Sequence, residues 1–358
     1  YLGTGFFNSH SKIRIRLLST NANDHFDEAF WERRLRYAWE YRKTVMGDDL
    51  SCCRVIFGEA DSFPGLTVDR FGDILVAQTL SLGIEQRKSL LFPMLARILR
   101  EDGQVIRGIY ERNDVSIRER EGMQQNKGFF PLENLATPES TQTEIVENGI
   151  RYLVDFENGQ KTGFFLDQKY NRQAVARLSR GKRVLDCFTH MGTFALNAGI
   201  AGASDVTGLD ISEYAVSQAE ANARLNGLQD TVHFRCANVL DELPKLAAAG
   251  EKYDVVILDP PAFTKSREAT KNAIKGYREI NMKGLKLVKD GGYLATCSCS
   301  HFMTQELLAK TVKEAAKATH KRLRQVEFRT QAPDHPILWA ADESYYLKFF
   351  IFQVVEEK

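Results

Sequence analysis

The feature that most constrains the fold of this chain is a regular alternation of short apolar runs and helical segments after Lys182. Short apolar runs are typical of strands that are covered on both faces, and the longer segments between them are typical of crossover helices. The pattern predicts a doubly wound, mostly parallel sheet with helices on both faces, which is a Rossmann-like α/β domain. The predicted elements are, in order, Val184–Phe188, Thr193–Ala201, Val206–Asp210, Glu213–Asn226, Val232–Cys236, Tyr253–Asp259, Ala269–Val288, Tyr293–Ser298, Gln305–Thr319, Gln325–Arg329 and Tyr346–Val355.

Length and composition limit the class of protein. A chain of 358 residues suits two domains, or two and a fragment, and 43% hydrophobic with 27% charged residues is ordinary for a globular protein. A net charge of +1 excludes a uniformly basic nucleic-acid coat but leaves room for a local basic groove. Six cysteines without repeated CxxC pairs predict reduced thiols in a cytoplasmic protein and no metal site. No apolar run reaches the length of a membrane span. Because the chain begins at Tyr1, we expect it to start inside a longer gene product.

The first residues carry a strand signal. Polar and apolar side chains alternate over residues 11–19, which predicts a half-buried strand with Lys12, Arg14 and Arg16 on its outward face. Such a face is either simply solvated or part of an RNA-contacting β-barrel.

The segments that follow predict how the chain is divided. A helix over residues 27–46, capped by Asp27, indicates a linker helix. Mixed strand and helix signals come next and indicate a scaffold domain. Asn148-Gly149 between two extended segments predicts a hairpin that leads the last domain. The expected division is therefore 1–22, a β fragment; 23–50, the linker helix; 51–142, a central α+β domain; and 143–358, the doubly wound domain with its leading hairpin.

Polar side chains stand at the ends of successive predicted strands. Asp186 and Asp210 end the first two, Asn238 follows the third, and Asp259 ends the fourth. In a doubly wound sheet, ligands bind at this carboxyl edge, where an acid after the second strand accepts ribose hydroxyls and Asn238 or its backbone can read an adenine edge. Only Gly192 follows the first strand, so the glycine-rich loop of a dinucleotide site is missing, which argues against an NAD dehydrogenase. The set predicts an adenosine ligand without phosphates, of which S-adenosylmethionine is the common cofactor.

The most specific motif is Asp259-Pro260-Pro261-Ala262-Phe263. Two prolines fix the backbone in a rigid turn, which holds the Asp259 carboxylate near the edge of the sheet. Phe263 is suited to stack on a planar base. This motif type occurs in enzymes that methylate ring nitrogen or carbon atoms of bases.

Two basic segments follow the motif in sequence. Phosphate contacts dominate the affinity of proteins for nucleic acids, although charged helix faces are often only solvated. The first segment is the stronger candidate for RNA binding, because it directly follows the proposed base pocket in the sequence. The first, residues 265–290, holds Lys265, Arg267, Lys271, Lys275, Arg278, Lys283, Lys286 and Lys289, and the second, residues 310–324, holds Lys310, Lys313, Lys317, Lys321, Arg322 and Arg324.

With these residues in view, the chain resembles the RlmI-like family of class I S-adenosylmethionine-dependent rRNA methyltransferases, which form 5-methylcytosine in large-subunit rRNA. The motifs that carry the resemblance are Gly159–Arg172, Gly276–Asn281, Ser298-Cys299-Ser300 and Asp334-His335-Pro336. The resemblance covers essentially the whole chain and implies that residues 1–22 are the end of a PUA domain, an RNA-binding β-barrel. The chain departs from the family at His190-Met191-Gly192, where many members have Tyr-Thr-Gly.

The resemblance also implies the cofactor and the partner. S-adenosylmethionine is expected as the cofactor, and the partner is expected to be large-subunit rRNA that presents an unstacked or single-stranded cytosine; a homo-oligomer is compatible with the sequence. Taken with the strand ends, the resemblance gives these candidate cofactor-binding residues: Gln160, Phe164, Asp167, Arg172, Asp186, Phe188, Thr189, Gly192, Asp210, Ile211, Asn226, Asn238, Val239, Asp259 and Pro260.

Cytosine methylation at C5 needs a nucleophile, because C5 is too weak to attack a sulfonium by itself, and a cysteine thiolate that adds to C6 activates it. Cys299 aligns with the catalytic cysteine of the family, and Asp259 is expected to contact the cytosine and stabilise the adduct. Cys297 is expected to be a core residue. His335 is either a general base or a structural residue between Asp334 and Pro336.

Two alternatives stay open at the level of sequence. The first is an RNA methyltransferase that acts on a guanine or adenine nitrogen, for which Cys299 would be incidental. The second is a catalytically idle RNA-binding or ribosome-assembly factor that keeps the fold.

Overall fold

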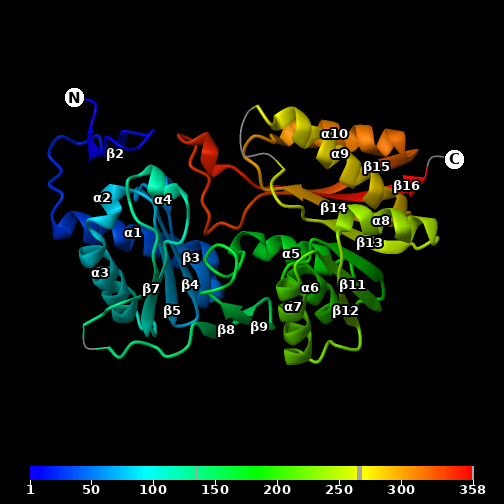
Figure 1. The fold of residues 1–358 in the computed structure, drawn as a ribbon, viewed down its shortest axis with the longest axis horizontal. Helices are drawn as coiled ribbons and strands as arrows, with labels where there is room; N and C mark the ends of the chain where they lie inside the picture. The colour runs from blue at the N-terminus through cyan, green and yellow to red at the C-terminus, as the bar shows by residue number, and fades with distance from the viewer. Residues whose placement is uncertain (134, 264–267, 357–358) are drawn as a thin grey trace. The chain divides into compact units, whose positions relative to one another are not determined.

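The computed structural model describes residues 1–133, 135–263 and 268–356. Their contacts divide the chain into two compact units, whose elements are labelled in Figure 1. The first unit contains Tyr1–Glu147, Tyr152–Asp167 and Pro333–Asp342, and the second contains Asn148–Arg151, Gln168–Ala332 and Glu343–Lys358.

The second unit is built on a seven-stranded sheet with the order β12-β11-β10-β13-β14-β16-β15. The first five of these strands run parallel, and β16 runs antiparallel to both of its neighbours. The strand order reverses between β10 and β13, which is the point where doubly wound sheets bind ligands. The predicted fold class is therefore confirmed. The strands are β10 (Arg183–Cys187), β11 (Asp205–Asp210), β12 (Val232–Cys236), β13 (Tyr253–Leu258), β14 (Val288–Ser298), β15 (Lys321–Arg329) and β16 (Lys348–Glu356).

Helices cover both faces of this sheet. Within the second unit, α9 packs against α8 and α10, and α5 packs against α6. Figure 1 shows α9 and α10 on one side of the strands and α6 and α7 on the other. Among the described helices of this unit, α5 and α8 are absent from the predicted elements, and Pro244 inside α8 explains why its sequence does not indicate a helix. The helices are α5 (Lys169–Ala176), α6 (Thr193–Ile200), α7 (Glu213–Leu225), α8 (Val239–Ala248), α9 (Thr270–Leu287) and α10 (Gln305–Ala318).

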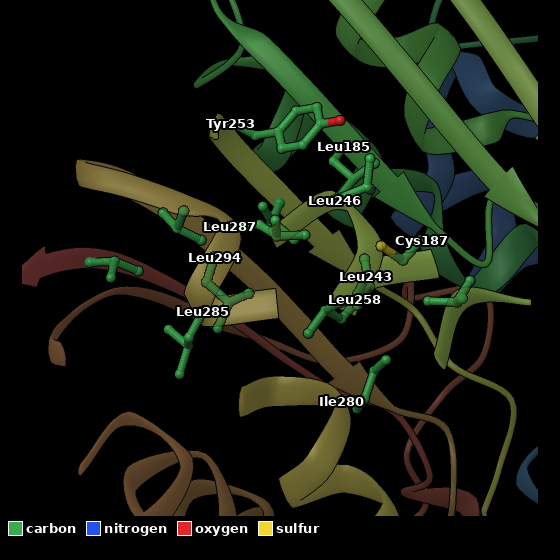
Figure 2. Packing of buried hydrophobic residues seen from close by; sticks show 14 of the residues in the cluster. Leu185, Cys187, Leu243, Leu246, Tyr253, Leu258, Ile280, Leu285, Leu287 and Leu294 are labelled. Carbon is green, nitrogen blue, oxygen red and sulfur yellow. The ribbon is translucent and has the colours of Figure 1, made fainter. Parts of the chain in front are cut away.

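A buried apolar cluster joins the sheet to α8 and α9 (Figure 2). Leu185, Leu258 and Leu294 enter it from strands β10, β13 and β14, and Leu243 and Ile280 enter it from the helices; all five are 0% exposed. Burial of one such side chain contributes about 1.5–3 kcal/mol to folding. The cluster therefore fixes the spacing of the strands whose carboxyl ends carry the candidate site.

The first unit is built on a five-stranded sheet with the order β3-β4-β5-β6-β7. Only β5 and β6 are parallel, and α3 connects them in the chain. None of the helices that the structure describes has the length and apolar character that crossing a membrane requires. The elements are β1 (Thr4–Phe7), β2 (Ile15–Ser19), α1 (Glu28–Met46), β3 (Cys52–Phe57), β4 (Leu66–Phe71), β5 (Ile74–Thr79), α2 (Leu82–Glu85), α3 (Lys88–Glu101), β6 (Gly108–Arg112), α4 (Ile117–Arg120), β7 (Lys127–Phe130), β8 (Gln142–Glu147) and β9 (Ile150–Asp155).

Helix α1 begins as predicted, because the Asp27 carboxylate accepts a hydrogen bond of 2.9 Å from the Phe30 amide. It is not a free linker, however, since it packs against α3 and β3. Trp31 and Trp39 are each 1% exposed. These large aromatic side chains bury enough apolar area to make α1 part of the first unit.

Strand β2 differs from the prediction in which side chains it exposes. Ile15 and Leu17 are exposed, whereas Arg16 is half-buried. The Arg16 guanidinium pairs with the carboxylate of Glu121 at 3.0 Å, and Glu121 is buried. The outward placement predicted for Arg16 is therefore wrong, because a buried carboxylate draws its partner charge inward.

The predicted hairpin at Asn148-Gly149 is confirmed. It joins β8 to β9, and φ is +55° at Asn148 and +78° at Gly149, as a two-residue turn between antiparallel strands requires.

The segment after the hairpin groups with the first unit, which differs from the predicted boundary at residue 143. The Arg112 guanidinium donates to the carbonyls of Phe156 and Gly159 at 2.8 and 2.9 Å. The Thr162 hydroxyl donates to Asp69 at 2.6 Å. Side-chain hydrogen bonds of this kind, between residues far apart in the sequence, cannot be read from local patterns.

Candidate functional site

The candidate site lies at the carboxyl edge of the parallel strands in the second unit. Asp186 is the second-to-last residue of strand β10, Asp210 ends β11, and Asp259 follows β13 directly. The three carboxyl groups act on one another, because those of Asp259 and Asp210 both raise the pKa of Asp186. The structure thus brings together the three acids that the sequence singled out.

Asp186 is the most buried member of the set, with 0% exposure. Its Oδ2 accepts hydrogen bonds from the Thr189 hydroxyl at 2.6 Å and the Ala195 amide at 3.0 Å. Its Oδ1 is also buried and has no hydrogen-bond partner among the described residues. The pKa of Asp186 is raised to about 7, chiefly by burial and then by the neighbouring carboxylates, against the lowering effect of its two hydrogen bonds. A buried acceptor left open in this way is suited to a ligand that brings a donor.

The loop between β10 and α6 holds an unusual backbone. Phe188 and His190 have φ of +66° and +50°, a region that residues with a side chain rarely occupy. Gly192 has φ of +79°, and a Cβ there would lie 2.6 Å from the ring of Phe234. Burial lowers the pKa of His190 to about 4, so this side chain is neutral at pH 7. Strained loops of this kind are found at ligand sites, which supports the sequence prediction for Phe188, Thr189 and Gly192.

Asp210 connects this loop to the end of β11. Its two carboxylate oxygens accept hydrogen bonds from the amides of His190 and Ser212, at 2.9 and 3.0 Å. Each oxygen keeps a second lone pair that a ribose hydroxyl can reach. The neighbouring Ile211 is 70% exposed, which leaves its apolar surface open to a ligand.

Two of the side chains expected in the site, those of Asn238 and Asn226, form hydrogen bonds that stabilise the ends of helices. Asn238 caps α8, because its Oδ1 accepts from the Leu240 amide at 3.0 Å. Asn226 caps the end of α7, and its side-chain amide bonds both the N–H and the C=O of Arg151, at 2.9 and 2.7 Å. These contacts favour a structural role for Asn226 over the cofactor contact expected from the sequence.

Asp259 is positioned from two directions. The Cys297 thiol donates to its Oδ1 at 2.9 Å, and the Gln168 amide donates to the same oxygen at 3.3 Å. Burial, with Asp259 as the next cause, raises the pKa of Cys297 well above that of a free thiol. Cys297 is 0% exposed, as expected of a core residue, and it is a neutral hydrogen-bond donor.

Pro260, which follows Asp259, and Phe263, which ends the motif, also have defined surroundings. Pro260 is buried, and the Phe263 ring packs on that of Tyr277 with 4.7 Å between centroids. Phe263 keeps part of its surface open, because it is only half-buried.

Cys299 directly follows β14, the strand beside β13. It is half-buried, whereas Cys52, Cys53, Cys187 and Cys297 are buried. The preceding Ser298 is locked in place, because its hydroxyl donates to the Tyr277 hydroxyl at 2.8 Å. Lys348 on β16 lies opposite Ser298 in the strand register and was not singled out by the sequence, although a lysine in an apolar strand is a readable signal.

The remaining expected cofactor residues are divided between the units. Gln160, Phe164 and Asp167 belong to the first unit, where the Phe164 ring packs on Tyr152 at 5.2 Å. Arg172 on α5 is 1% exposed, and its guanidinium lies 6.0 Å from the Phe194 ring centroid in the second unit. Val239 is 2% exposed in the first turn of α8.

His335 belongs to the first unit and is 2% exposed. Its Nδ1 lies 2.9 Å from the carboxylate of Asp334, and its ring contacts that of Phe57. Although burial acts to raise it, the pKa of Asp334 is held below its ordinary value by His335, with help from the Arg54 amide. This closed network supports the structural alternative for His335.

The first basic segment lies mainly on α9. Lys271, Lys275 and Arg278 are exposed, and their spacing places them on one face of the helix. By contrast, Lys283 pairs with Glu279, and Lys289 pairs with Asp254. Lys265 and Arg267 lie outside the described residues. Within the described ranges, no group of three or more His, Cys, Asp or Glu side chains is arranged to hold a metal ion.

Comparison with known proteins agrees with this geometry. The sequence profile of the S-adenosylmethionine-dependent methyltransferase family matches residues 131–352. A protein of Aeromonas salmonicida named ribosomal RNA large subunit methyltransferase I is 39% identical over 97% of this chain and 86% of its own.

Two solved structures share the fold. A Streptococcus mutans protein assigned as an S-adenosylmethionine-dependent methyltransferase has a TM-score of 0.82 at 22% identity, with 98% of this chain and 88% of that chain covered. A structure described as a methyltransferase in complex with S-adenosylhomocysteine has the same TM-score at 21% identity and the same coverage.

Proposed function

Since the chain belongs to the S-adenosylmethionine-dependent methyltransferase family that includes the ribosomal RNA large subunit methyltransferases I, we propose that it methylates a cytosine of large-subunit rRNA at C5. Cys299 is the proposed nucleophile. The observation that carries this assignment is the half-buried Cys299 thiol at the end of β14, next to the strand that ends in Asp259.

The residues of the second unit fit S-adenosylmethionine. The Asp210 carboxylate is suited to the ribose hydroxyls. The open Oδ1 of Asp186 is suited to a donor such as the ammonium group of the methionine part. Gly192 allows the left-handed backbone of the loop that would face the cofactor, and a Cβ at this position would collide with Phe234. The cofactor, when bound, supplies an electrophilic methyl group.

The proposed reaction uses the thiol of Cys299 as a temporary covalent partner. The thiolate forms a bond to C6 of the cytosine, and C5 becomes nucleophilic enough to take the methyl group. A base then removes the proton from C5, the bond between sulfur and C6 breaks, and the aromatic ring and the thiolate are restored. Asp259 would hold the amino group or ring nitrogen of the cytosine, since Cys297 and Gln168 fix its orientation.

The RNA is proposed to bind along α9. Lys271, Lys275 and Arg278 form an exposed cationic face, and a target base in folded RNA must leave its stack to enter the pocket. We also propose residues 1–22 as the end of a PUA-like domain, which the exposed apolar side chains of β2 support. A large-subunit rRNA substrate favours a cytoplasmic location.

The test is transfer of labelled methyl groups to large-subunit rRNA that lacks the modification, followed by nucleoside analysis. We expect 5-methylcytosine from the wild type and none from Cys299→Ala. Cys52→Ala is the matched control, because Cys52 lies on β3 in the first unit and is not among the proposed site residues, so its loss should not affect transfer. Methylated guanine or adenine, or an active Cys299→Ala variant, would refute the cytosine mechanism, and cofactor binding without any transfer would favour an idle assembly factor.

A further inference from the structure

One charged side chain of the second unit is buried at the start of a strand, directly before four apolar residues. Lys348 begins β16 and is followed by Phe349, Phe350, Ile351 and Phe352. It is 1% exposed. A buried ammonium group is unfavourable unless hydrogen bonds and an opposite charge compensate it, so the surroundings of Lys348 should reveal its purpose.

The hydrogen bonds of Lys348 lead to the segment that carries Cys299. The Nζ atom donates to the carbonyl of Ser300 at 2.6 Å and to that of Tyr346 at 2.9 Å. In the antiparallel pairing of β14 with β16, Lys348 lies opposite Ser298. Lys348 therefore contacts the residues on both sides of Cys299.

No carboxylate of the described residues supplies the opposite charge for the Lys348 ammonium group. Among the described residues, Lys348 forms no ion pair with Asp or Glu. The groups that act on its charge are the thiols of Cys299 and Cys297 and, more weakly, the carboxylate of Glu306. Because Coulomb interactions are reciprocal, a cation that gains from a thiolate at Cys299 stabilises that thiolate equally.

We propose that Lys348 is a positioning residue whose positive charge holds Cys299 as a reactive thiolate at neutral pH. This assignment rests on the proposed function, which names Cys299 as the nucleophile. Cys297 cannot be the recipient of this effect, since its thiol donates its proton to Asp259.

Among the described residues, other titratable groups near Cys299 include Tyr277, Asp259 and His301. Tyr277 on α9 is neutral, since burial raises its pKa far above the physiological range. Asp259 is negative and would disfavour a thiolate, although its Oδ1 is already engaged by Cys297 and Gln168. His301 is exposed and packs on Phe302. Burial lowers the pKa of Lys348 to about 8, so its charge is largely present at pH 7 and is lost above pH 8.

The test measures thiolate formation directly and does not depend on methyl transfer. The full chain is treated with iodoacetamide from pH 5.5 to 9, and alkylation of the Cys299 peptide is followed by mass spectrometry. Cys236 in the same molecule is the reference, because it is exposed on β12 of the same sheet. The variants are Lys348→Met, which removes the charge and the donors, and Lys348→Gln, which removes the charge but keeps N–H donors for the two carbonyls.

We expect both variants to alkylate Cys299 at least about tenfold more slowly at pH 7, and the midpoint of its pH profile to move upward by about one unit or more, with Cys236 unchanged. A wild-type profile for Lys348→Gln would overturn the proposal, because it would make hydrogen bonding the whole role of Lys348. A wild-type profile for both variants would overturn it as well. If the proposed function is wrong, methyl transfer yields no 5-methylcytosine while the Cys299 profile still depends on Lys348.

Discussion

Asp186→Asn is expected to stabilise the second unit at neutral pH while it weakens cofactor binding. The pKa of Asp186 is raised from 3.8 to about 7, which corresponds to a cost of about 4 kcal/mol when the folded carboxyl is ionised. The sign follows from the direction of the shift. Below pH 3.8 both the folded and the unfolded carboxyl are protonated and the cost is absent; it grows between pH 3.8 and 7 and is complete above pH 7.

Asparagine avoids this cost, because it is neutral at every pH. Its side-chain oxygen still accepts from Thr189 and Ala195, and the pKa of about 7 already includes the effect of these two hydrogen bonds on the carboxylate. We therefore expect the variant to be more stable than the wild type by about 4 kcal/mol at pH 7.5, and about equally stable at pH 4.

The assay is urea unfolding of the ligand-free protein at both pH values, followed by far-ultraviolet circular dichroism. Trp31, Trp39 and Trp339 all belong to the first unit, so tryptophan fluorescence provides an internal control for that part of the chain. A difference between variant and wild type that is the same at pH 4 and pH 7.5 would refute the account of Asp186. S-adenosylmethionine should raise the melting temperature of the wild type more than that of the variant.

Two further predictions concern the loop and the cationic helix. Gly192→Ala should lower the free energy of unfolding by about 1–3 kcal/mol and weaken cofactor binding, because a Cβ at φ of +79° meets the Phe234 ring. Calorimetry measures both the stability and the cofactor affinity, and a variant with unchanged values would show that the loop adapts freely. Replacement of Lys271, Lys275 and Arg278 by alanine should reduce the slope of log affinity against log salt concentration for single-stranded rRNA by about 2 in filter binding. The matched control replaces Lys310, Lys313 and Lys317 on α10, and an equal loss in that control would remove the case for α9.

The sheet of the second unit was predictable from the sequence because strands that are covered on both faces must be apolar along their length. Val184, Val206 and Val255 lie inside such runs, and all three are at most 1% exposed. The ends of these strands were predictable as well, because an acid such as Asp186 or Asp210 interrupts the apolar run at the edge of the sheet where ligands bind.

Other parts depend on contacts between distant segments and left no local signal. Gln168 approaches Asp259 although 91 positions separate them in the chain. Lys348 reaches the Cys299 segment only because β16 pairs with β14. Arg16 turned inward because Glu121 is buried, which reverses the simple alternation of β2. The sequence suggested Asn226 as a cofactor contact, whereas in the structure its side chain forms hydrogen bonds with the backbone of Arg151.

The most direct test of the central claim is to trap the covalent step. Large-subunit rRNA that contains 5-fluorocytidine should accept the Cys299 thiolate at C6 and the methyl group at C5, but the fluorine at C5 cannot leave as a proton does, so the bond between protein and RNA should persist. We predict a denaturation-resistant complex that forms with S-adenosylmethionine, maps to the Cys299 peptide and is absent from Cys299→Ala. A wild-type protein that methylates unsubstituted RNA but forms no such complex, or a complex that persists in Cys299→Ala, would contradict the proposed mechanism.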